Sequence, residues 1–318
     1  MEEEGYITDV ITDEAISFID REKKKIQPFY LSVHYTAPHS PWIDCHPKKY
    51  TVLYEDCPFE TCPQGETHPW AKTEVLAGYQ KPRESLIGYF AAVTAMDDNV
   101  GRILKKLEEE NLMEDTLIIF SSDNGFNCGH HGIWGKGNGT FPLNMYDSSV
   151  KVPLIMCHKG RIPEDQVCDE MHSGYDFMPT LLEYLGFEND EADELPGKSF
   201  LPALMGQEHK NEDSRVVVFD EYGPVRMIRS RKYKLVHRYP YGPDEFYDLE
   251  ADPGETHNGI EDEQYQDMIQ DMKKQMELWF LQYVDPRIDG AKEPVMGGGQ
   301  RDLAGLLGPG INVYGENI

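Results

Sequence analysis

The chain has 318 residues, 39% of them hydrophobic, which is enough to bury a large core and form one main domain with a smaller one. Its 57 acidic and 30 basic residues give a net charge of -27, which argues against nucleic acid and anionic membranes as partners. No apolar run approaches the roughly 20 residues of a membrane span, and the acidic start is unlike a signal peptide. We therefore expect a protein that is cytoplasmic as written.

The amino-terminal part of the chain predicts a helix, a strand and a long insertion. Thr12 is placed to cap a helix that ends at Pro28. Residues 29–35 predict a strand, so His39, in the turn that follows, lies at the carboxyl end of that strand. Residues 43–83 lack periodicity and predict an irregular insertion, and such segments often shape access to a substrate site.

The central part of the chain alternates between helical and strand patterns. Apolar residues recur at helical spacing over 84–111 and are followed by the apolar run 116–120, which predicts a buried strand. A further apolar strand is expected at 152–156, and a helix at 176–185. This alternation indicates the α/β class, with a mostly parallel sheet flanked by helices.

The pattern changes after residue 208. Short β-type runs occur at 216–219, 225–229 and 233–236, and they are joined closely enough to be antiparallel. A helix with a stripe of methionines follows at 262–283. We therefore expect an α/β domain over 1–208, a small antiparallel α+β subdomain over 209–290, and an extended tail over 291–318.

The stretch richest in chemical groups is the glycine-rich loop that follows the second predicted strand. In open α/β sheets, ligands bind at the carboxyl ends of strands. Asp123 and Asn124 offer oxygen donors suited to Ca²⁺ or Mg²⁺, whereas Lys136 and the adjacent His130 and His131 offer positive charge for an anion. The loop therefore predicts a site that a metal and an oxyanion share, and an anionic small substrate.

Seven segments carry a further, ordered pattern. They are 28–41 (ending Pro-His-Ser-Pro), 96–102 (Met-Asp-Asp-Asn-Val-Gly-Arg), 122–125 (Ser-Asp-Asn-Gly), 131–136 (His-Gly-x-x-Gly-Lys), 152–155 (Val-Pro-Leu-Ile), 176–182 (Asp-x-x-Pro-Thr-Leu-Leu) and 247–255 (Tyr-Asp-Leu-x-x-Asp-Pro-x-Glu). In this order they resemble the motifs of the formylglycine-dependent sulfatases of the alkaline-phosphatase superfamily. The resemblance implies an alkaline-phosphatase-like fold and a sulfuric ester hydrolase.

The resemblance also implies roles for individual residues. It makes Asp123 and Asn124 metal ligands, with Ca²⁺ favoured over Mg²⁺, and Lys136 a sulfate contact. His39 becomes a sulfate contact or the proton donor to the leaving alcohol, and His131 a further catalytic candidate. These groups suit the chemistry, because cleaving a sulfate ester needs positive charge at the sulfuryl oxygens and a proton for the departing oxygen. Taken singly, a histidine after a strand and an Asp-Asn-Gly sequence are more often turn residues.

One departure from the family pattern is large. Sulfatases carry, before the Pro-His-x-Pro segment, a C/S-x-P/A-x-R motif whose Cys or Ser becomes formylglycine, together with two acidic metal ligands. Neither feature is found in this chain. Cys45 begins a similar sequence, but Lys49 replaces the arginine and the sequence follows His39 instead of preceding it. We therefore expect a chain truncated at its amino terminus and inactive alone.

Two other functions stay open at this point. A phosphoric or phosphonic monoester hydrolase of the same superfamily would use similar oxyanion contacts, and a non-catalytic, anion-binding pseudoenzyme fragment would need no nucleophile. The sulfated substrate, a small molecule or a glycan, and the oligomeric state are not determined by these motifs. The six cysteines follow no zinc or disulfide spacing, so we expect structural or surface thiols.

Overall fold

The structure is a computed structural model, and it describes residues 4–189, 192, 194–207, 214–220, 224–239, 242–286, 289 and 291. The chain forms two compact units. Unit 1 comprises the residues up to 139 together with 151–162, and unit 2 comprises 140–150 together with the residues from 163 onward. This division differs from the predicted boundary at residue 208. Most of the tail expected over 291–318 lies outside the described residues.

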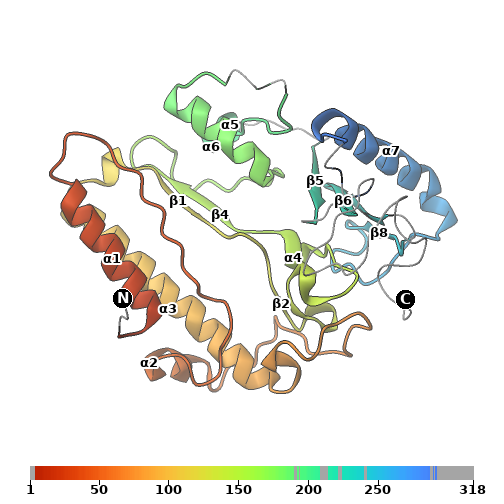
Figure 1. The fold of residues 1–318 in the computed structure, drawn as a ribbon, viewed down its shortest axis with the longest axis horizontal. Coiled ribbons are helices and arrows are strands. Elements are labelled where there is room, and N and C mark those ends of the chain that lie inside the picture. Colours follow the sequence, from red (N-terminus) through yellow and green to blue (C-terminus); the bar gives the residue numbers. More distant parts are fainter. Residues whose placement is uncertain are drawn as a thin grey trace. The chain divides into compact units, whose positions relative to one another are not determined.

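Two long helices lie side by side in unit 1 (Figure 1): α1 (Ile7–Glu22) and α3 (Pro82–Glu109). A proline at the first position of α3 fits the start of a helix, because that position needs no backbone donor. Small and branched apolar side chains are buried on both helices, namely Ala15 and Ile19 on α1 and Ala91, Ala92 and Ala95 on α3. The predicted helix at 84–111 is confirmed, with ends shifted by two residues.

The start of α1 corrects one expectation. Thr12 does not cap this helix, because α1 begins five residues earlier, at Ile7. The Thr12 side chain is buried, and its hydroxyl donates a hydrogen bond to the Thr8 carbonyl oxygen at 2.9 Å. A second hydrogen bond, at 2.7 Å, joins the hydroxyl groups of Thr12 and Tyr35. A threonine inside a helix satisfies its hydroxyl in this way when tertiary packing overrides its preference for caps.

Four charged side chains connect the carboxyl ends of α1 and α3. Lys23 and Lys106 each form ion pairs with Asp20 and with Glu110, at distances of 2.6 to 2.7 Å. The hydrogen bonds from Lys106 and Lys23 lower the pKa of Asp20 from 3.8 to about 2. The network is on the surface, so its contribution depends on salt concentration.

The strands of unit 1 pair differently from the prediction. β1 (Ile118–Ser121) pairs antiparallel with β4 (Leu154–Cys157), and every strand pair within the described part of the chain is antiparallel. The expected mostly parallel pairing is therefore not found among these strands. Residues 29–35 are extended, with Leu31, Val33 and Tyr35 more buried than their neighbours, but they form no backbone hydrogen bond with other described residues. An apolar run predicts a strand, but the neighbouring backbone decides whether and in which direction it pairs.

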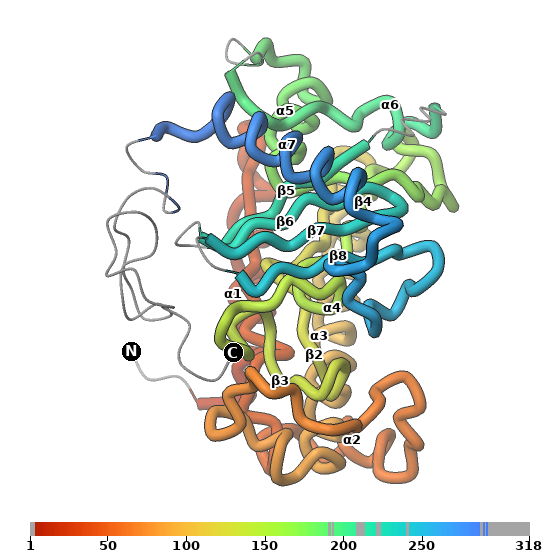
Figure 2. Tube along the Cα trace, turned by 90° about the vertical axis from the view of Figure 1, so that its right-hand side faces the viewer, coloured from red at the N-terminus to blue at the C-terminus, as the bar shows by residue number. Residues whose placement is uncertain are grey.

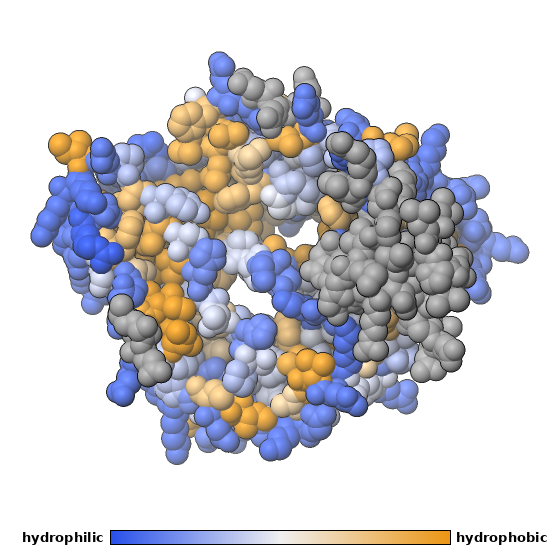
Figure 3. Space-filling model, viewed as in Figure 1, coloured by the Kyte–Doolittle hydropathy of each residue, from blue (hydrophilic) through white to orange (hydrophobic). Residues whose placement is uncertain are grey.

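The β1–β4 pair is less buried than expected. β1 is half-buried, and on β4 Leu154 and Ile155 are 40% and 61% exposed. Figure 3 shows apolar side chains gathered over this part of unit 1. The predicted burial of the strand at 116–120 is therefore only partly correct, because one two-stranded sheet leaves much of its surface uncovered.

The insertion predicted at 43–83 is mostly irregular, as expected. It contains the short helix α2 (Lys48–Thr51) and two 3₁₀ turns, Val52–Tyr54 and Ala77–Tyr79. Further 3₁₀ turns in unit 1 are Met113–Asp115, His130–Gly132 and Gly137–Gly139. The insertion packs on an apolar cluster formed by Trp42, Phe59, Cys62, Leu86, Cys128 and Trp134.

Unit 2 contains the predicted antiparallel subdomain. Its sheet has the order β5 (Arg215–Phe219), β6 (Val225–Ser230), β7 (Tyr233–Arg238) and β8 (Glu245–Asp248), and β8 was not predicted. Helix α7 (Gln266–Tyr283), preceded by the 3₁₀ turn Glu263–Tyr265, crosses this sheet (Figure 2). Met272 and Met276 are fully buried against it, so the methionine stripe is core. No helix in the described part of the chain is long and apolar enough to cross a membrane.

Two further segments belong to unit 2 because they bond to its sheet. In α5 (Gly174–Leu185) the Tyr175 hydroxyl accepts a hydrogen bond from the Val217 backbone N–H at 3.1 Å. The segment 140–150 includes the short helix α4 (Asp147–Val150). Another short helix, α6 (Leu201–Leu204), follows α5. Helical periodicity at 176–185 predicted α5 correctly but could not show which sheet it covers.

A buried charge cluster holds α4 on the sheet. The fully buried Lys234 ammonium donates to the Asp147 carboxylate, the Glu255 carboxylate and the Met145 carbonyl oxygen, the last at 3.0 Å. Burial raises the pKa of Glu255. Burial also acts to raise the pKa of Asp147, but Lys234 and Arg229 outweigh it, and the net shift is downward. Such a cluster is costly to break, because removing one partner leaves buried charges unpaired.

Candidate active site

The glycine-rich loop after β1 folds into a small hairpin of β2 (Asn127–Cys128) and β3 (Trp134–Gly135). Its turn is left-handed at His131 (φ 55°) and at Gly132 (φ +70°). At Gly132 a side chain would also collide with the insertion, because a Cβ atom there would lie 1.9 Å from the Glu66 carbonyl oxygen. Glycine is therefore required for both its backbone conformation and its close approach.

The insertion holds this hairpin along its length. Hydrogen bonds join the insertion to the hairpin and to the turn that follows it: Gln64 Nε2 to the Cys128 carbonyl oxygen at 2.8 Å, His68 N to the Gly132 carbonyl oxygen at 3.1 Å, Trp134 N to the Tyr79 hydroxyl at 2.9 Å, and Lys72 N to the Gly139 carbonyl oxygen at 2.9 Å. The segment 62–79 therefore acts as a clamp on the hairpin, a role that its irregular sequence does not reveal.

Three of the predicted site residues come together beside this hairpin. The Lys136 ammonium donates a hydrogen bond to Asn124 Oδ1 at 3.1 Å, and Asn124 Nδ2 donates to the Gly125 carbonyl oxygen at 2.9 Å. Asp123 is exposed, and its carboxylate forms no hydrogen bond or ion pair with other described residues. One carboxylate, one amide oxygen and one ammonium group therefore lie at the start of the hairpin, with the carboxylate open to a ligand.

His39 lies in an exposed turn. Its Nδ1–H donates a hydrogen bond to the Ser40 carbonyl oxygen at 2.9 Å. Because a carbonyl oxygen only accepts, Nδ1 carries a hydrogen in this arrangement, and Nε2 is left to act on another group. This tautomer suits a residue that exchanges a proton through Nε2.

Aromatic packing brings the turn of His39 to the hairpin. Trp42 is buried, and its indole N–H donates to the Pro38 carbonyl oxygen at 2.8 Å. Its ring lies 5.4 Å from the Phe126 ring and 5.8 Å from the Trp134 ring, measured between centroids. Both aromatics lie between Asp123 and Lys136 in the chain, so one aromatic cluster contacts the turn of His39 and the loop of these two residues. Side-chain packing therefore brings the two segments together, and no pair of parallel strands is needed to do so.

The two histidines of the hairpin differ in their surroundings. His131 is half-buried in the left-handed turn and takes part in interactions there. His130 is also half-buried, and its Nδ1 atom is buried with no hydrogen-bond partner among the described residues. A buried polar atom without a partner is uncommon in native proteins. His130, which its sequence context favours less than His131, therefore presents a second imidazole at this turn.

The oxygen donors of the loop are of the type that a hard divalent cation prefers, but there are few of them. Asp123 and Asn124 provide one carboxylate and one amide oxygen, which are ligand types that Ca²⁺ and Mg²⁺ prefer. Within the described ranges, no group of three or more His, Cys, Asp or Glu side chains is placed to hold a metal ion. A Ca²⁺ ion usually gathers about six to eight oxygens, so these two residues would form only part of its coordination shell.

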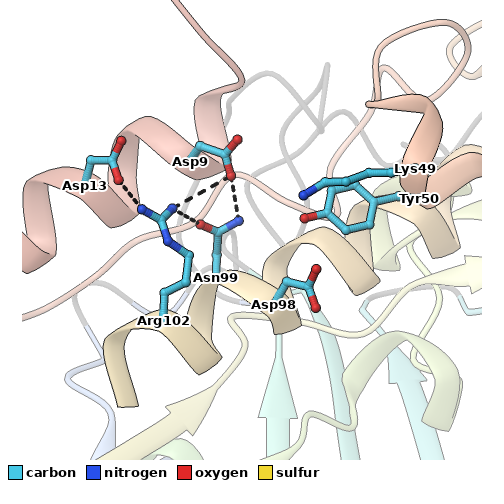
Figure 4. A pocket seen from close by; sticks show the side chains of 7 residues that line it. All are labelled: Asp9, Asp13, Lys49, Tyr50, Asp98, Asn99 and Arg102. Carbon is cyan, nitrogen blue, oxygen red and sulfur yellow. Dashed lines mark hydrogen bonds and ion pairs between the residues drawn. The ribbon is translucent and has the colours of Figure 1, made fainter. Parts of the chain in front are cut away.

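A separate cavity of about 530 Å³ lies beside α1, α2 and α3 (Figure 4), lined by Asp9, Asp13, Lys49, Tyr50, Asp98, Asn99 and Arg102. It contains none of the predicted site residues. Arg102 donates to Asn99 Oδ1 at 2.8 Å and pairs with Asp13, and Asn99 Nδ2 donates to Asp9 at 2.8 Å. Several of its polar groups thus pair across the two long helices. The Met-Asp-Asp-Asn-Val-Gly-Arg motif at 96–102 therefore has a structural role in joining α3 to α1.

Comparison with protein families identifies the family of the chain. The family profile described as Sulfatase matches residues 1–187. A second profile, described as N-sulphoglucosamine sulphohydrolase, C-terminal, matches residues 129–280. The first match covers more than half of the chain, so the chain belongs to the sulfatase family, as the ordered motifs predicted.

Several curated proteins are similar in sequence. The choline-sulfatase of Rhizobium meliloti (strain 1021) is 30% identical over 254 residues, which are 75% of this chain and 48% of the relative. The N-acetylglucosamine-6-O-sulfatase of Bacteroides thetaiotaomicron is 25% identical, covering 95% and 66% respectively, and the arylsulfatase of Clostridium perfringens is 28% identical, covering 86% and 57%. The chain therefore spans between about half and two thirds of the length of these relatives.

Solved structures confirm the fold class. A putative sulfatase, yidJ, from Bacteroides fragilis has a TM-score of 0.73 and 25% identity, over 88% of this chain and 59% of that one. The phosphonate monoester hydrolase of Silicibacter pomeroyi has a TM-score of 0.72 and 20% identity, over 87% and 60%. At 20% identity, the similarity to the phosphonate monoester hydrolase shows only a shared fold. The chain thus has the α/β, alkaline-phosphatase-like fold with an antiparallel carboxyl-terminal sheet.

Proposed function

We propose that these residues form the anion-binding and metal-binding part of a sulfuric ester hydrolase, which releases inorganic sulfate from a sulfated small molecule or glycan. The observation that carries the proposal is the contact between Lys136 and Asn124, next to the open Asp123 carboxylate, in a chain of the sulfatase family. The names of the relatives, a choline-sulfatase and an N-acetylglucosamine-6-O-sulfatase, support both substrate classes.

In this proposal each residue has one task. The Lys136 ammonium contacts the sulfuryl oxygens and offsets the negative charge that grows on them. His39, once its Nε2 has taken up a proton while Nδ1–H stays bonded to the Ser40 carbonyl oxygen, gives that proton to the departing alcohol oxygen. Asp123 and Asn124 would hold part of the shell of a Ca²⁺ ion, or of Mg²⁺, which when bound supplies further positive charge beside the sulfate.

No residue of the chain is assigned as the nucleophile. The C/S-x-P/A-x-R motif is not among the 318 residues. Cys45, in the similar sequence, is exposed, and its thiol donates to the Ile43 carbonyl oxygen at 3.1 Å. The proposal therefore covers anion binding, metal binding and proton donation, and leaves nucleophilic attack to a formylglycine that this chain does not encode.

A phosphonic or phosphoric monoester hydrolase is the second candidate. It is favoured by the fold shared with the Silicibacter pomeroyi enzyme and by a 27% identical relative from Trinickia caryophylli named a multifunctional alkaline phosphatase superfamily protein. Lys136 would contact phosphoryl and sulfuryl oxygens in the same way, so the ligand preference must separate the two.

Calorimetric titration of the full 318-residue chain with sulfate, phosphate and methylphosphonate, in the presence of Ca²⁺, tests the proposal. We expect sulfate to bind best and the Lys136→Ala variant to bind it at least about tenfold more weakly, a loss on the order of 1.4 kcal/mol. Lys159→Ala is the matched control, because Lys159 is an exposed lysine elsewhere in unit 1. Equal sulfate binding by the natural chain and both variants would refute the anion site, and a clear preference for methylphosphonate would favour the second candidate.

A further inference from the structure

Two buried thiols meet beside the candidate site. Cys62 belongs to the insertion and Cys128 to β2, and both lie in the same apolar cluster, 7% and 4% exposed. The two side chains are close enough to affect each other's ionisation. The two residues are distant in sequence, so this contact exists only in the folded chain. Neither thiol has a task in the proposed hydrolysis.

A shared amide holds the two cysteines together. The Gln64 side-chain N–H₂ group donates to the Cys62 carbonyl oxygen at 3.0 Å and to the Cys128 carbonyl oxygen at 2.8 Å. Its side-chain oxygen accepts from the Trp134 indole N–H at 3.2 Å. Figure 2 shows the insertion against β2 and β3 in this region. The backbones at the two thiols are therefore tied to each other and to the hairpin before any covalent bond forms.

We propose that Cys62 and Cys128 form a reversible disulfide that fastens the insertion to the site hairpin when the protein meets a small disulfide such as oxidised glutathione. The bond would join the first residue of the segment 62–79 covalently to β2. Because His131 and Lys136 lie on or next to this hairpin, the disulfide would hold their backbone in the arrangement seen here. This inference stands on the thiol contact and does not depend on the sulfatase proposal.

The environment makes the two thiols unequal, and this inequality decides which thiol reacts first. The neighbouring Cys128 thiol lowers the pKa of the Cys62 thiol against the opposing effect of burial, whereas the neighbouring Cys62, together with burial, raises the pKa of the Cys128 thiol. The Cys62 thiolate is therefore the attacking group. It displaces one glutathione from oxidised glutathione, and Cys128, after losing its proton, displaces the second from Cys62. Two protein thiols and one oxidised glutathione thus become one protein disulfide and two reduced glutathiones.

The experiment uses the full chain in which the exposed Cys45, Cys157 and Cys168 are replaced by serine, so that surface thiols do not react. After incubation with oxidised glutathione, we expect the intact mass to fall by two hydrogens, with no glutathione retained. Peptide mapping should link Cys62 to Cys128. Because the bond closes a long loop, the unfolding midpoint should rise on the order of 10 °C, and dithiothreitol should reverse the rise.

Cys57 supplies the control, because it packs against the same cluster without being part of its buried core. The Cys57→Ser variant should still lose two hydrogens, and Cys62→Ser should not. If Cys62→Ser fails to fold, the peptide map of the serine-substituted chain with Cys57, Cys62 and Cys128 intact decides the matter. Any of three results would overturn the proposal. These are a disulfide to Cys57, a stable glutathione adduct, and two thiols that stay reduced when mild urea opens the chain.

Discussion

Replacing Gly132 by alanine should loosen the site hairpin from its clamp. The position has φ +70°, and a Cβ atom would lie 1.9 Å from the Glu66 carbonyl oxygen and 2.7 Å from the His68 backbone nitrogen. Both are backbone atoms that cannot rotate away. The Gly132 carbonyl oxygen also accepts a hydrogen bond from His68 N at 3.1 Å, so moving the neighbour breaks a bond as well as relieving the collision.

Three effects contribute to the loss of folding free energy in Gly132→Ala. A left-handed conformation costs an alanine roughly 1–2 kcal/mol. The Glu66 carbonyl oxygen must move by about 1.5 Å to reach ordinary contact, and the lost hydrogen bond adds about 1 kcal/mol. Displaced packing against the insertion adds a further cost of about 1 kcal/mol or more. We expect Gly132→Ala to lower the free energy of unfolding of unit 1 by at least about 3 kcal/mol.

Alanine substitutions at two other glycines of unit 1 measure these contributions separately. Gly160 has φ +75° but no atom within 4 Å of a Cβ, so Gly160→Ala measures the backbone conformation alone. Gly101, inside α3, has neither a positive φ nor a neighbour within 4 Å, and its change to alanine should stabilise by up to roughly 1 kcal/mol.

Urea unfolding followed by the fluorescence of the buried Trp42 and Trp134, with sulfate titration of the folded variants, measures the effect. The expected order of stability is Gly101→Ala, then Gly160→Ala, then Gly132→Ala, with weakened sulfate binding in the last alone. If Gly132→Ala costs no more than Gly160→Ala, the segment 62–79 does not pack on the hairpin, and the clamp must be abandoned.

Other predictions concern both units. Lys234→Met should destabilise unit 2 by about 3–5 kcal/mol, since it leaves the buried Glu255 carboxylate without its cationic partner while Asp147 keeps Arg229, whereas the exposed Lys232→Met should have no measurable effect in the same denaturation series. Asp20→Asn should be less stable than the natural chain at neutral pH. Because folding lowers the Asp20 pKa, this difference in stability should disappear as the pH falls from 3.8 towards about 2. A difference that does not change with pH would show that the ion-pair network contributes nothing. Calorimetry should give Ca²⁺ a dissociation constant on the order of millimolar for this chain and no binding after Asp123→Ala, and equal affinity would make Asp123 a turn residue. The purified chain should not hydrolyse an aryl sulfate; turnover that Cys45→Ala abolishes would make Cys45 a nucleophile.

The local pattern of the chain was enough to predict three of its longer helices and its family. Helical spacing predicted α3, α5 and α7 within a few residues, because each has an apolar face that must be buried. The short β-type runs predicted β5, β6 and β7 as an antiparallel sheet, because short connections allow no other pairing. The loop motif likewise predicted that Lys136 and Asn124 lie together, since both belong to one short stretch.

Features that depend on partners distant in sequence could not be predicted. β1 pairs antiparallel with β4, and the segment 29–35 pairs with no other part of the chain that the structure describes. Both outcomes depend on which backbone lies alongside, which an apolar run does not encode. The position of His39 beside the hairpin comes from Trp42, whose ring packs on aromatics far along the chain. β8 was missed because its short, mixed sequence has no period-two pattern and becomes a strand only through pairing with β7.

The division into two units has the same origin. Helix α5 and the segment 140–150 lie before the predicted boundary at 208, yet they belong to unit 2 because Tyr175 bonds to β5 and because Lys234 gathers Asp147 beneath the sheet. From the sequence alone, a lysine in a strand, such as Lys234 in β7, is expected to face solvent. Only the tertiary structure, by placing two carboxylates and a carbonyl oxygen around it, makes burial of that charge favourable.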